Sequence, residues 1–305
     1  MVREGVLVIG SANMDLVVRT EHFPRPGETV FGSGFGMFPG GKGANQAVAC
    51  ARLGSKTHFI GKMGADIFGD TIASGMRRDS ILLGHLRVDR SAPTGIATIT
   101  LDRSGQNEII VASGGNMKLQ AGDIDRARAL FRKVRVVLLQ LEIPLPTVAH
   151  ALRLARAAGA VTILNPAPGR KLPKSLLRMV DILTPNETEA AILTGRRLND
   201  ASSARHAAHD LLSLGVQSVI VTLGARGCAL ASGDLWKVFP ALRVKPIDTT
   251  AAGDAFNGAL AHALARGMGL QAAIPLANSV AAYSVTKMGA QTSMPNIAEL
   301  KHFLR

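Results

Sequence analysis

One aspartate stands at the predicted start of an apolar helix, in the run 248–260, which reads DTTAAGDAFNGAL. The side chains before Asp254 are small, so the unpaired amides of Ala252, Gly253 and Asp254 would be open to an anion. A carboxylate here has a structural explanation, since an acid in the first turn offsets the helix dipole. It could also accept a hydroxyl proton while the amides hold a phosphate, which is most of what phosphoryl transfer needs besides a metal. We favour catalysis, because two further motifs agree with it.

The second motif is the glycine-rich segment 39–47, PGGKGANQA. Residues 36–42 nearly fit a P-loop, but Gly43 stands where a P-loop needs Ser or Thr for Mg²⁺, and no core strand precedes the segment. We therefore reject a P-loop. The glycines could simply permit a tight turn into a helix. They would also let a polyhydroxylated ligand reach the backbone, with Asn45 as both donor and acceptor.

The third motif, 184–189 or TPNETE, follows an apolar strand. Glu187 and Glu189 could be ordinary first-turn acids of a helix. Asn186 and Glu189, three residues apart, would share one helix face and could orient water around Mg²⁺ and phosphate. The motif is informative only beside the other two.

Short apolar runs alternate with helical stretches along most of the chain. The predicted strands are 6–10, 58–61, 134–140, 161–164, 181–184, 218–222 and 228–231. Several are apolar throughout, which is typical of parallel strands buried on both faces. Helices predicted over 147–158 and 202–214 end at Gly159 and Gly215. The alternation predicts an α/β fold with a doubly wound, mainly parallel sheet flanked by helices.

Two segments, about 12–38 and 94–114, interrupt this alternation. The second reads as a hairpin that turns at 102–105. Strands with no helix between them do not easily join a parallel core. We expect them to form a small β-sheet lid over the carboxyl edge of the main sheet, where α/β proteins bind ligands. Residues 1–305 are interpreted as one domain.

Composition places the chain among soluble globular proteins. Of 305 residues, 47% are hydrophobic and 19% charged, which excludes a disordered chain. No apolar stretch approaches the ~20 residues of a membrane span, and the N-terminus lacks the pattern of a secretion signal. Cys50 and Cys228 lie among small apolar residues, so a disulfide framework is not expected. We expect a reduced, cytoplasmic protein with no membrane partner.

The charge balance is strongly basic, with 35 basic and 22 acidic residues and a net charge of +13. Such a balance could indicate nucleic-acid binding. The basic residues are scattered, however, and only 4% of residues are aromatic, so there is no stacking platform for bases. We interpret the charge as a solvated surface that can also attract anionic substrates such as ATP, with no nucleic-acid partner. His206 and His209 have no further metal ligand nearby, and no Ser-His-Asp pattern occurs.

Together and in this order, the three motifs resemble the ribokinase/pfkB family of carbohydrate kinases. Further segments carry the same resemblance: 10–15 (GSANMD), 139–142 (LQLE), 165–168 (NPAP) and 284–293 (SVTKMGAQTS). The chain departs slightly at Gly114-Gly115, where Gly-Ala is more usual. The resemblance covers essentially the whole chain. It implies phosphorylation of D-ribose at the 5-hydroxyl by ATP to give ribose 5-phosphate, with Mg²⁺ and K⁺ as cofactors and a homodimer formed through the lid.

The resemblance also implies roles for individual residues. Asp254 would be the general base, and the amides of Ala252 and Gly253 would form the anion hole, with Lys42 near the phosphate. The implied sugar-binding set is Asn13, Met14, Asp15, Gly41, Lys42, Gly43, Ala44, Asn45, Glu142 and Asp254. For Met14, packing inside the lid is an equally good explanation.

The implied nucleotide-binding set is Asn186, Thr222, Leu223, Gly224, Ala225, Arg226, Gly227, Gly253, Asp254 and Asn278. Glu189 would organise Mg²⁺ through water. The K⁺ site would comprise Asp248, Thr250, Ser284, Lys287, Gly289 and Ser293. Because an ammonium group cannot ligate a cation, Lys287 would contribute its carbonyl only.

Three alternatives stay open. A kinase for deoxyribose or fructose would need the same machinery, whereas a nucleoside kinase would need an apolar base pocket that the sequence does not show. A sugar-phosphate kinase would need a second phosphate site. A non-catalytic sugar- or nucleotide-binding regulator is disfavoured by Asp254 and its glycine-rich anion site.

Overall fold

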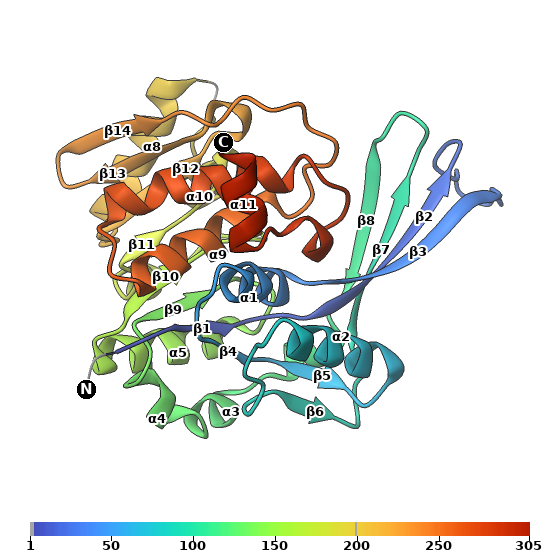
Figure 1. The fold of residues 1–305 in the computed structure, drawn as a ribbon, viewed down its shortest axis with the longest axis horizontal. Helices are drawn as coiled ribbons and strands as arrows, with labels where there is room; N and C mark the ends of the chain where they lie inside the picture. The colour runs from blue at the N-terminus through green and yellow to red at the C-terminus, as the bar shows by residue number, and fades with distance from the viewer. Residues whose placement is uncertain (1–2, 199) are drawn as a thin grey trace.

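A computed structural model describes residues 3–198 and 200–305 (Figure 1). The strands of the central sheet are β1 Val6–Ile9, β4 Thr57–Ile60, β9 Val136–Leu139, β10 Val161–Leu164, β11 Ile182–Leu183, β12 Ser218–Thr222, β13 Cys228–Ser232 and β14 Leu235–Phe239. In this described part of the chain they form an eight-stranded sheet in the order β14-β13-β12-β11-β10-β9-β1-β4. All neighbours from β4 to β12 are parallel, and β13 and β14 add an antiparallel hairpin at one edge. The predicted mainly parallel sheet is confirmed.

Both faces of this sheet are buried. In β1, Val6 and Val8 belong to one hydrophobic core, while Leu7 and Ile9 belong to the other. Successive side chains of a strand point to opposite faces. A strand between two cores must therefore be apolar at every position, which is why its sequence shows no polar alternation.

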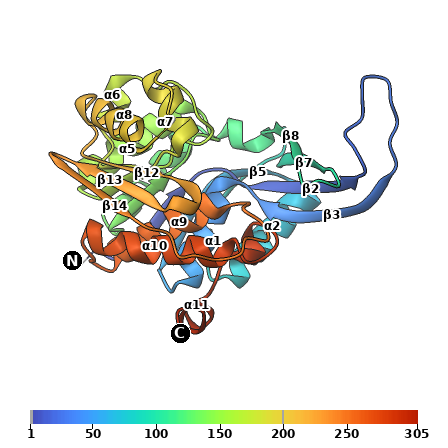
Figure 2. The ribbon, with the colours of Figure 1, turned by 90° about the horizontal axis from the view of Figure 1, so that it is seen from above.

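Helices cover each face as a separate layer, as Figure 2 shows from above. One layer consists of α1 Lys42–Arg52, α2 Ile67–Arg78, α9 Ala252–Ala265, α10 Leu270–Ser284 and α11 Ile297–Phe303. The other consists of α3 Ala121–Asp125, α4 Arg128–Phe131, α5 Leu145–Ala158, α6 Lys174–Leu177, α7 Glu187–Thr194 and α8 Ala201–Ser213. The glycine expected to end α5, Gly159, is left-handed with φ of 67°, and Gly215 lies just beyond α8 with φ of 107°. The observed helices differ from the predicted ones by one or two residues at their ends.

A second sheet projects from the body of the molecule (Figure 1). It consists of β2 Asn13–Thr20, β3 Gly32–Gly40, β7 Gly95–Leu101 and β8 Asn107–Ala112, in the order β3-β2-β7-β8. We call this sheet the lid. The segments expected to form it are these strands, and the glycine-rich run before α1 is itself strand β3. A short parallel pair, β5 Lys62–Gly64 with β6 Arg87–Asp89, forms a separate two-stranded sheet.

Both cysteines lie inside the body of the molecule. Cys50 and Cys228 are free thiols and fully buried, and Cys50 Sγ lies 3.2 Å from the carbonyl oxygen of Gly258, where α1 packs on α9. Burial raises the pKa of the Cys228 thiol to about 12. Within residues 3–198 and 200–305, no helix combines the length and apolar character needed to cross a bilayer.

Candidate active site

A cavity of about 420 Å³ opens where the parallel strands end. Residues that follow four neighbouring strands line it: Asn13 after β1, Glu142 after β9, Asn165 after β10 and Asn186 after β11. The carboxyl ends of parallel strands meet at one edge of the sheet, so residues far apart in the chain converge there. Lid side chains, including Ile99 of β7, complete the wall. The lid therefore borders the cavity, as expected.

The start of α9 faces this cavity. Ala251, the residue before the helix, is left-handed with φ of 59° and makes no side-chain cap. A methyl group added at Gly253 would meet no atom within 4 Å, so the backbone there faces open space. In the described chain the Gly253 and Asp254 amides have no backbone acceptor, while the Ala252 amide makes a 3.3 Å bond to Thr249. The helix start can thus receive an anion, chiefly through the later amides.

The Asp254 carboxylate is nearly buried and receives two hydrogen bonds. Asn45 Nδ2 donates to Oδ2 at 2.9 Å, and Gln46 Nε2 donates to Oδ1 at 2.9 Å. Burial raises the pKa of Asp254, while the nearby Lys42 ammonium and these two donors counteract the rise. Such an environment supports a carboxylate that can take up a proton.

Gln46 is the centre of a buried amide network that the sequence did not single out. Its Oε1 accepts a hydrogen bond from Gln140 Nε2 at 2.6 Å, and its Nε2 also donates to Asn165 Oδ1 at 3.1 Å. Gln46 and Gln140 are fully buried. The network connects the ends of β9 and β10 to Asp254. Its one sequence signal is position: Gln46 follows Asn45 in the first turn of α1.

The end of the cavity near β2 is polar and acidic. Asn13 Oδ1 accepts a hydrogen bond from Asn116 Nδ2 at 2.7 Å. Burial, with the charges of Glu142 and Asp254, raises the pKa of Asp15 to about 7. Asn45 Oδ1 is buried and has no hydrogen-bond partner within the described residues. These acceptors suit a ligand with several hydroxyl groups.

Lys42 and Glu142 join the two ends of the cavity. The Glu142 carboxylate accepts hydrogen bonds from Ser11 Oγ and, at 3.0 Å, from the Lys42 amide. Burial alone would lower the pKa of Lys42, but the charges of Asp254 and Glu142 raise it. The ammonium group therefore stays protonated beside the carboxylates, where it can neutralise a phosphate.

Close packing explains the glycines of the second motif. Gly41 has φ of 85°, and a methyl group there would lie 2.7 Å from the Asn13 amide nitrogen. At Gly43 a methyl group would lie 2.6 Å from the Ser11 amide nitrogen. These glycines let the loop after β1 lie directly against the start of α1. The structural explanation thus holds for both, and only Gly41 also lines the cavity.

The third motif caps a helix and also reaches the cavity. Asn186 Oδ1 accepts a hydrogen bond from the Glu189 amide at 2.7 Å, and Glu189 Oε2 accepts one from the Asn186 amide at 2.9 Å. Both residues line the cavity with Thr222. Burial raises the pKa of Glu189, which the Asn186 amide and Lys42 oppose. The two interpretations of this motif are therefore compatible.

Several residues of the implied sugar and nucleotide sets lie outside the cavity. Met14 packs in the hydrophobic core and does not line this cavity, which favours packing as the explanation of this residue. The Asn278 amide donates to the Phe239 and Pro240 carbonyls at 3.2 Å. The others that do not line it are Gly43, Ala44, Leu223, Gly224, Ala225, Arg226 and Gly227.

The two chain segments of the implied K⁺ site lie next to each other. The Ile247 amide donates to the Val285 carbonyl at 2.7 Å, and the Gly289 amide donates to Asp248 Oδ2 at 2.8 Å. Thr250 lines the cavity wall. The remaining members, Ser284, Lys287 and Ser293, belong to the second segment and do not line the cavity.

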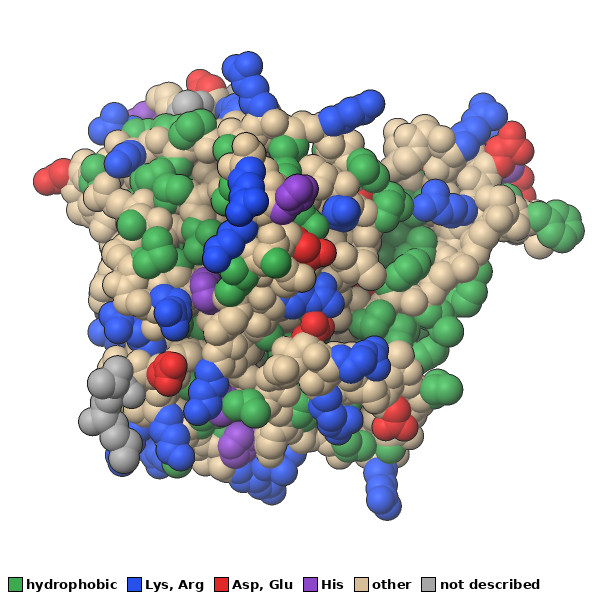
Figure 3. Space-filling view, in the orientation of Figure 1, with side chains coloured by type: hydrophobic (Ala, Val, Ile, Leu, Met, Phe, Trp, Pro, Cys, Tyr) green, Lys and Arg blue, Asp and Glu red, His purple; other side chains and the backbone are tan. Residues whose placement is uncertain are grey.

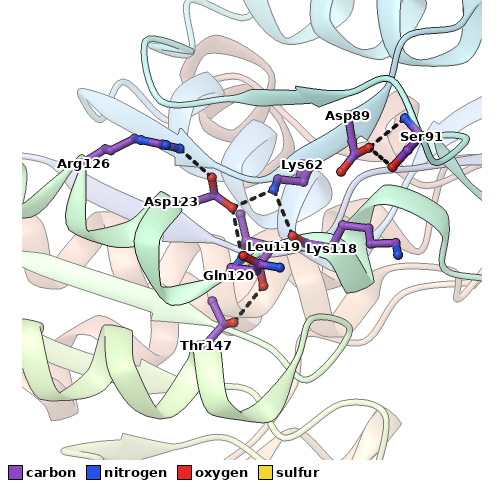
Figure 4. Close-up of polar contacts among 9 residues, drawn as sticks. All are labelled: Lys62, Asp89, Ser91, Lys118, Leu119, Gln120, Asp123, Arg126 and Thr147. Atoms are coloured by element: carbon purple, nitrogen blue, oxygen red, sulfur yellow. Dashed lines mark hydrogen bonds and ion pairs between the residues drawn. The ribbon is translucent and has the colours of Figure 1, made fainter.

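A largely buried ion pair joins Lys62 to Asp123 (Figure 4). Lys62 Nζ of β5 lies 2.7 Å from Asp123 Oδ2 and donates to the Lys118 carbonyl at 2.9 Å. Lys118 ends the 3-10 helix η1, Gly114–Lys118, which carries Asn116. We call these contacts the Lys62 clamp. Because Asn116 orients Asn13, the clamp positions a residue of the cavity indirectly.

Comparisons with known proteins identify the family of the chain. Residues 3–297 match the pfkB family carbohydrate kinases. Ribokinase from Haemophilus influenzae is 40% identical over 302 residues, covering 99% of each chain. Deoxyribokinase from Salmonella typhi is 38% identical over 300 residues, covering 98% of each. A structure of Arabidopsis thaliana ribokinase complexed with ribose and ATP superposes with a TM-score of 0.93 at 33% identity, covering 100% of this chain and 99% of that one. The chain belongs to the pfkB family of carbohydrate kinases.

Proposed function

We propose that this kinase phosphorylates D-ribose at the 5-hydroxyl with ATP and releases ribose 5-phosphate and ADP. The observation that carries the proposal is the pairing of a buried, hydrogen-bonded Asp254 with an open helix start at Gly253. The Haemophilus and Arabidopsis relatives are ribokinases, which supports ribose as the acceptor. The polar end of the cavity, with Asn13 and Asp15, suits a sugar that has several free hydroxyl groups.

The proposed reaction is an in-line displacement. Asp254 takes the proton of the 5-hydroxyl as the sugar oxygen bonds to the γ-phosphorus, and the bond between that phosphorus and the oxygen it shares with ADP breaks. The Gly253 amide and the Lys42 ammonium stabilise charge on the transferring group. The lid would keep water from the phosphate during transfer.

We propose that Mg²⁺ accompanies ATP, where it would neutralise charge on the phosphates and Glu189 would hold it through water. The cavity suits a metal held mainly by phosphate and water, since within residues 3–198 and 200–305 no group of three or more His, Cys, Asp or Glu side chains is placed to hold a metal ion. Glu189 Oε2 is used by the Asn186 amide, which leaves the other oxygen to orient a metal-bound water. Asn186 and Thr222 would lie along the nucleotide.

We also propose that K⁺ binds beside the helix start and shapes the loop before α9. Asp248, Thr250, Ser284, Lys287, Gly289 and Ser293 supply carboxylate, hydroxyl and carbonyl oxygens, the ligand type that hard cations prefer. The Ile247–Val285 and Gly289–Asp248 hydrogen bonds that join the two segments support this assignment. In the proposal, residues 1–305 act as one cytoplasmic domain that dimerises through the lid.

Asp254→Asn tests the proposed base. The amide keeps the shape and removes the proton acceptor, so kcat for ribose should fall by roughly 10²- to 10⁴-fold. A coupled ADP-release assay measures kcat, and calorimetric titration with ribose checks that binding persists. Asp70→Asn is a matched control, because Asp70 is also a first-turn acid but is exposed on α2. Near-normal turnover by a folded Asp254→Asn enzyme would exclude this carboxylate as the base.

The Salmonella relative makes deoxyribose the specific competitor, since it is a deoxyribokinase at nearly the same identity. The ratio of kcat/KM for ribose and for 2-deoxyribose decides between the two. We expect ribose to be preferred, because a polar site loses hydrogen bonds when the 2-hydroxyl is absent. A panel that includes fructose and a nucleoside covers the other acceptors, and ribose binding without any ADP release would indicate a regulator instead.

A further inference from the structure

A second cavity, of about 610 Å³, lies at the opposite end of the central sheet from the active site. Its walls include Glu4 and Lys56, just before β1 and β4, and Lys133, before β9. These three strands are parallel neighbours, so their amino ends meet at one edge. In Figure 3, Lys and Arg side chains gather along the lower part of the molecule, where α4 lies in Figure 1.

The charges around this cavity do not balance. Four cations line it, Lys56, Arg126, Arg132 and Lys133, against one carboxylate, Glu4. In the described part of the chain Lys56, Arg132 and Lys133 form no ion pair. Arg126 pairs with Asp123 at 3.1 Å, but its side chain is 64% exposed. An exposed pair of this kind is weak, so Arg126 remains available to another anion.

Two histidines of the lining sit within this positive field. Burial, together with the charges of Lys56 and His85, lowers the pKa of His58 to about 4. Burial and Arg87 lower the pKa of His85 as well. Both imidazoles are therefore neutral at pH 7 and can each donate one N–H. His85 Nδ1 is buried without a hydrogen-bond partner within the described residues.

The remaining wall is apolar and includes Leu83, Ala127 and Leu130. The volume lies in the range of small-molecule sites, and a site that binds an organic anion needs both an apolar wall and placed charges. We propose that this cavity binds a small organic phosphate, with the phosphate on Lys56, Arg132 and Lys133 and the carbon skeleton on Leu83 and Leu130. The site is separate from the proposed kinase chemistry and does not depend on it.

Histidine NMR can test the proposal locally, because no histidine lines the first cavity among the described residues. The probe is glycerol 2-phosphate, with glycerol as the uncharged comparison, added to the full-length protein with labelled imidazoles. The His58 signal is assigned from His58→Gln. The phosphate should shift the His58 and His85 signals saturably and raise the pKa of His58, since an anion favours the charged imidazolium. Glycerol should shift neither.

The double variant Lys56→Gln/Lys133→Gln should weaken glycerol 2-phosphate binding roughly tenfold or more, because two charged contacts are lost. Lys245→Gln/Lys301→Gln is the matched control. It removes the same charge from exposed positions that line neither cavity, and it should bind as the natural chain does. Circular dichroism confirms that both double variants fold.

Three results would overturn the proposal. The first is the absence of a saturable shift, and the second is an equal affinity in the two double variants. The third is a shift produced by a DNA duplex at lower concentration than glycerol 2-phosphate and lost in Lys56→Gln/Lys133→Gln. That third result would make the surface a polynucleotide site.

Discussion

Two adjacent positions of α1 hold the carboxylate of Asp254. Asn45 lines the cavity and can turn toward a ligand, whereas Gln46 is fully buried and fixed by Gln140. The two hydrogen-bond donors to Asp254 therefore have different roles. Asn45 lines the cavity, and Gln46 holds the carboxylate of Asp254, the proposed base, from the buried side.

Gln46→Met should lower kcat and move the acidic limb of the kcat–pH profile upward by roughly one unit. The variant removes the donor to Asp254 Oδ1. A hydrogen bond to the charged form favours that form, so its loss raises the pKa of Asp254 and the base ionises only at higher pH. Rates with saturating ribose and ATP across pH measure the shift. Gln140→Met leaves both donors to Asp254 in place and should move the limb less. An unmoved limb in folded Gln46→Met would contradict this role.

Asp15 costs stability in its ionised form. Its pKa rises from 3.8 unfolded to about 7 folded, so between these values the folded chain binds more protons and stability falls as pH rises. Asp15→Asn should therefore raise the free energy of unfolding by about 2 kcal/mol at pH 8 and change it little at pH 4. Urea unfolding at both pH values measures this.

Asp102 provides the contrast for that experiment. Hydrogen bonds in its turn, chiefly from Ser104, lower the pKa of this exposed carboxylate. Because the pKa of Asp102 is lowered and not raised, its ionised form stabilises the folded chain. Asp102→Asn should therefore slightly lower stability at pH 8. Equal effects of Asp15→Asn at both pH values would show that ionisation of Asp15 is not the cause.

At the scale of elements, the Lys62 clamp holds η1 against β5 and so controls Asn116. Lys62→Met leaves Asp123 buried without its closest cation, which should cost about 2–4 kcal/mol of stability. The KM for ribose should rise while the KM for ATP stays the same. The reason is that Asn116 orients Asn13 at the end of the cavity near β2, where the proposal places the sugar. Urea unfolding and initial rates measure the two effects.

A double-mutant cycle with Asp123→Asn isolates the pair energy in the clamp. Arg126→Met is the comparison, since its pair with the same carboxylate is largely exposed and should contribute below about 1 kcal/mol. If Lys62→Met and Arg126→Met behaved alike, the clamp would have no special role.

Sequence patterns predicted most of the elements for a physical reason. Parallel strands between two cores are apolar throughout, and the hairpin of β7 and β8 turns through polar residues at 102–105. β14 was missed because it lies at the sheet edge, where only Phe239 is buried and the pattern is weak. Residues 32–40 form a strand although glycine has a low propensity for strands. Hydrogen-bonded pairing with β2 along its whole length stabilises this strand.

Residues that line the cavity could be predicted where one short segment holds them, as at Asp254, Asn186 and Glu189. It was not predictable where partners meet only after folding. Gln46 and Asn165 are 119 residues apart, and no local sequence pattern predicts the hydrogen bond between them. Met14 shows the reverse: it lies between two cavity residues, but strand alternation turns it into the core.

At the scale of the whole molecule, the lid exposes an apolar surface on the face away from the cavity. Met37 of β3 and Ile110 of β8 are 54% and 74% exposed, and both lie in register with Leu16 and Thr98 across the sheet. Residues one step along, Ile109 and Val111, line the cavity instead. A second copy packed on this outer face would remove the apolar surface from water.

Ile110→Glu should therefore convert a dimer to monomers of 32.0 kDa in sedimentation experiments. A charge placed in an apolar interface is costly to desolvate. Val238→Glu is the matched control, because Val238 is also an exposed apolar residue but lies on β14, away from the lid. A natural chain that sediments as a monomer at all concentrations would exclude a lid dimer.

The reactivity of the two buried cysteines can be used to measure local opening of the structure. Each thiol is shielded from reagents, Cys50 between α1 and α9 and Cys228 on β13. Alkylation of either one requires that its surroundings first come apart. The alkylation rate of each cysteine therefore measures how often the structure around it opens. A bound ligand that slows alkylation of one cysteine more than of the other stabilises the part of the molecule around that cysteine.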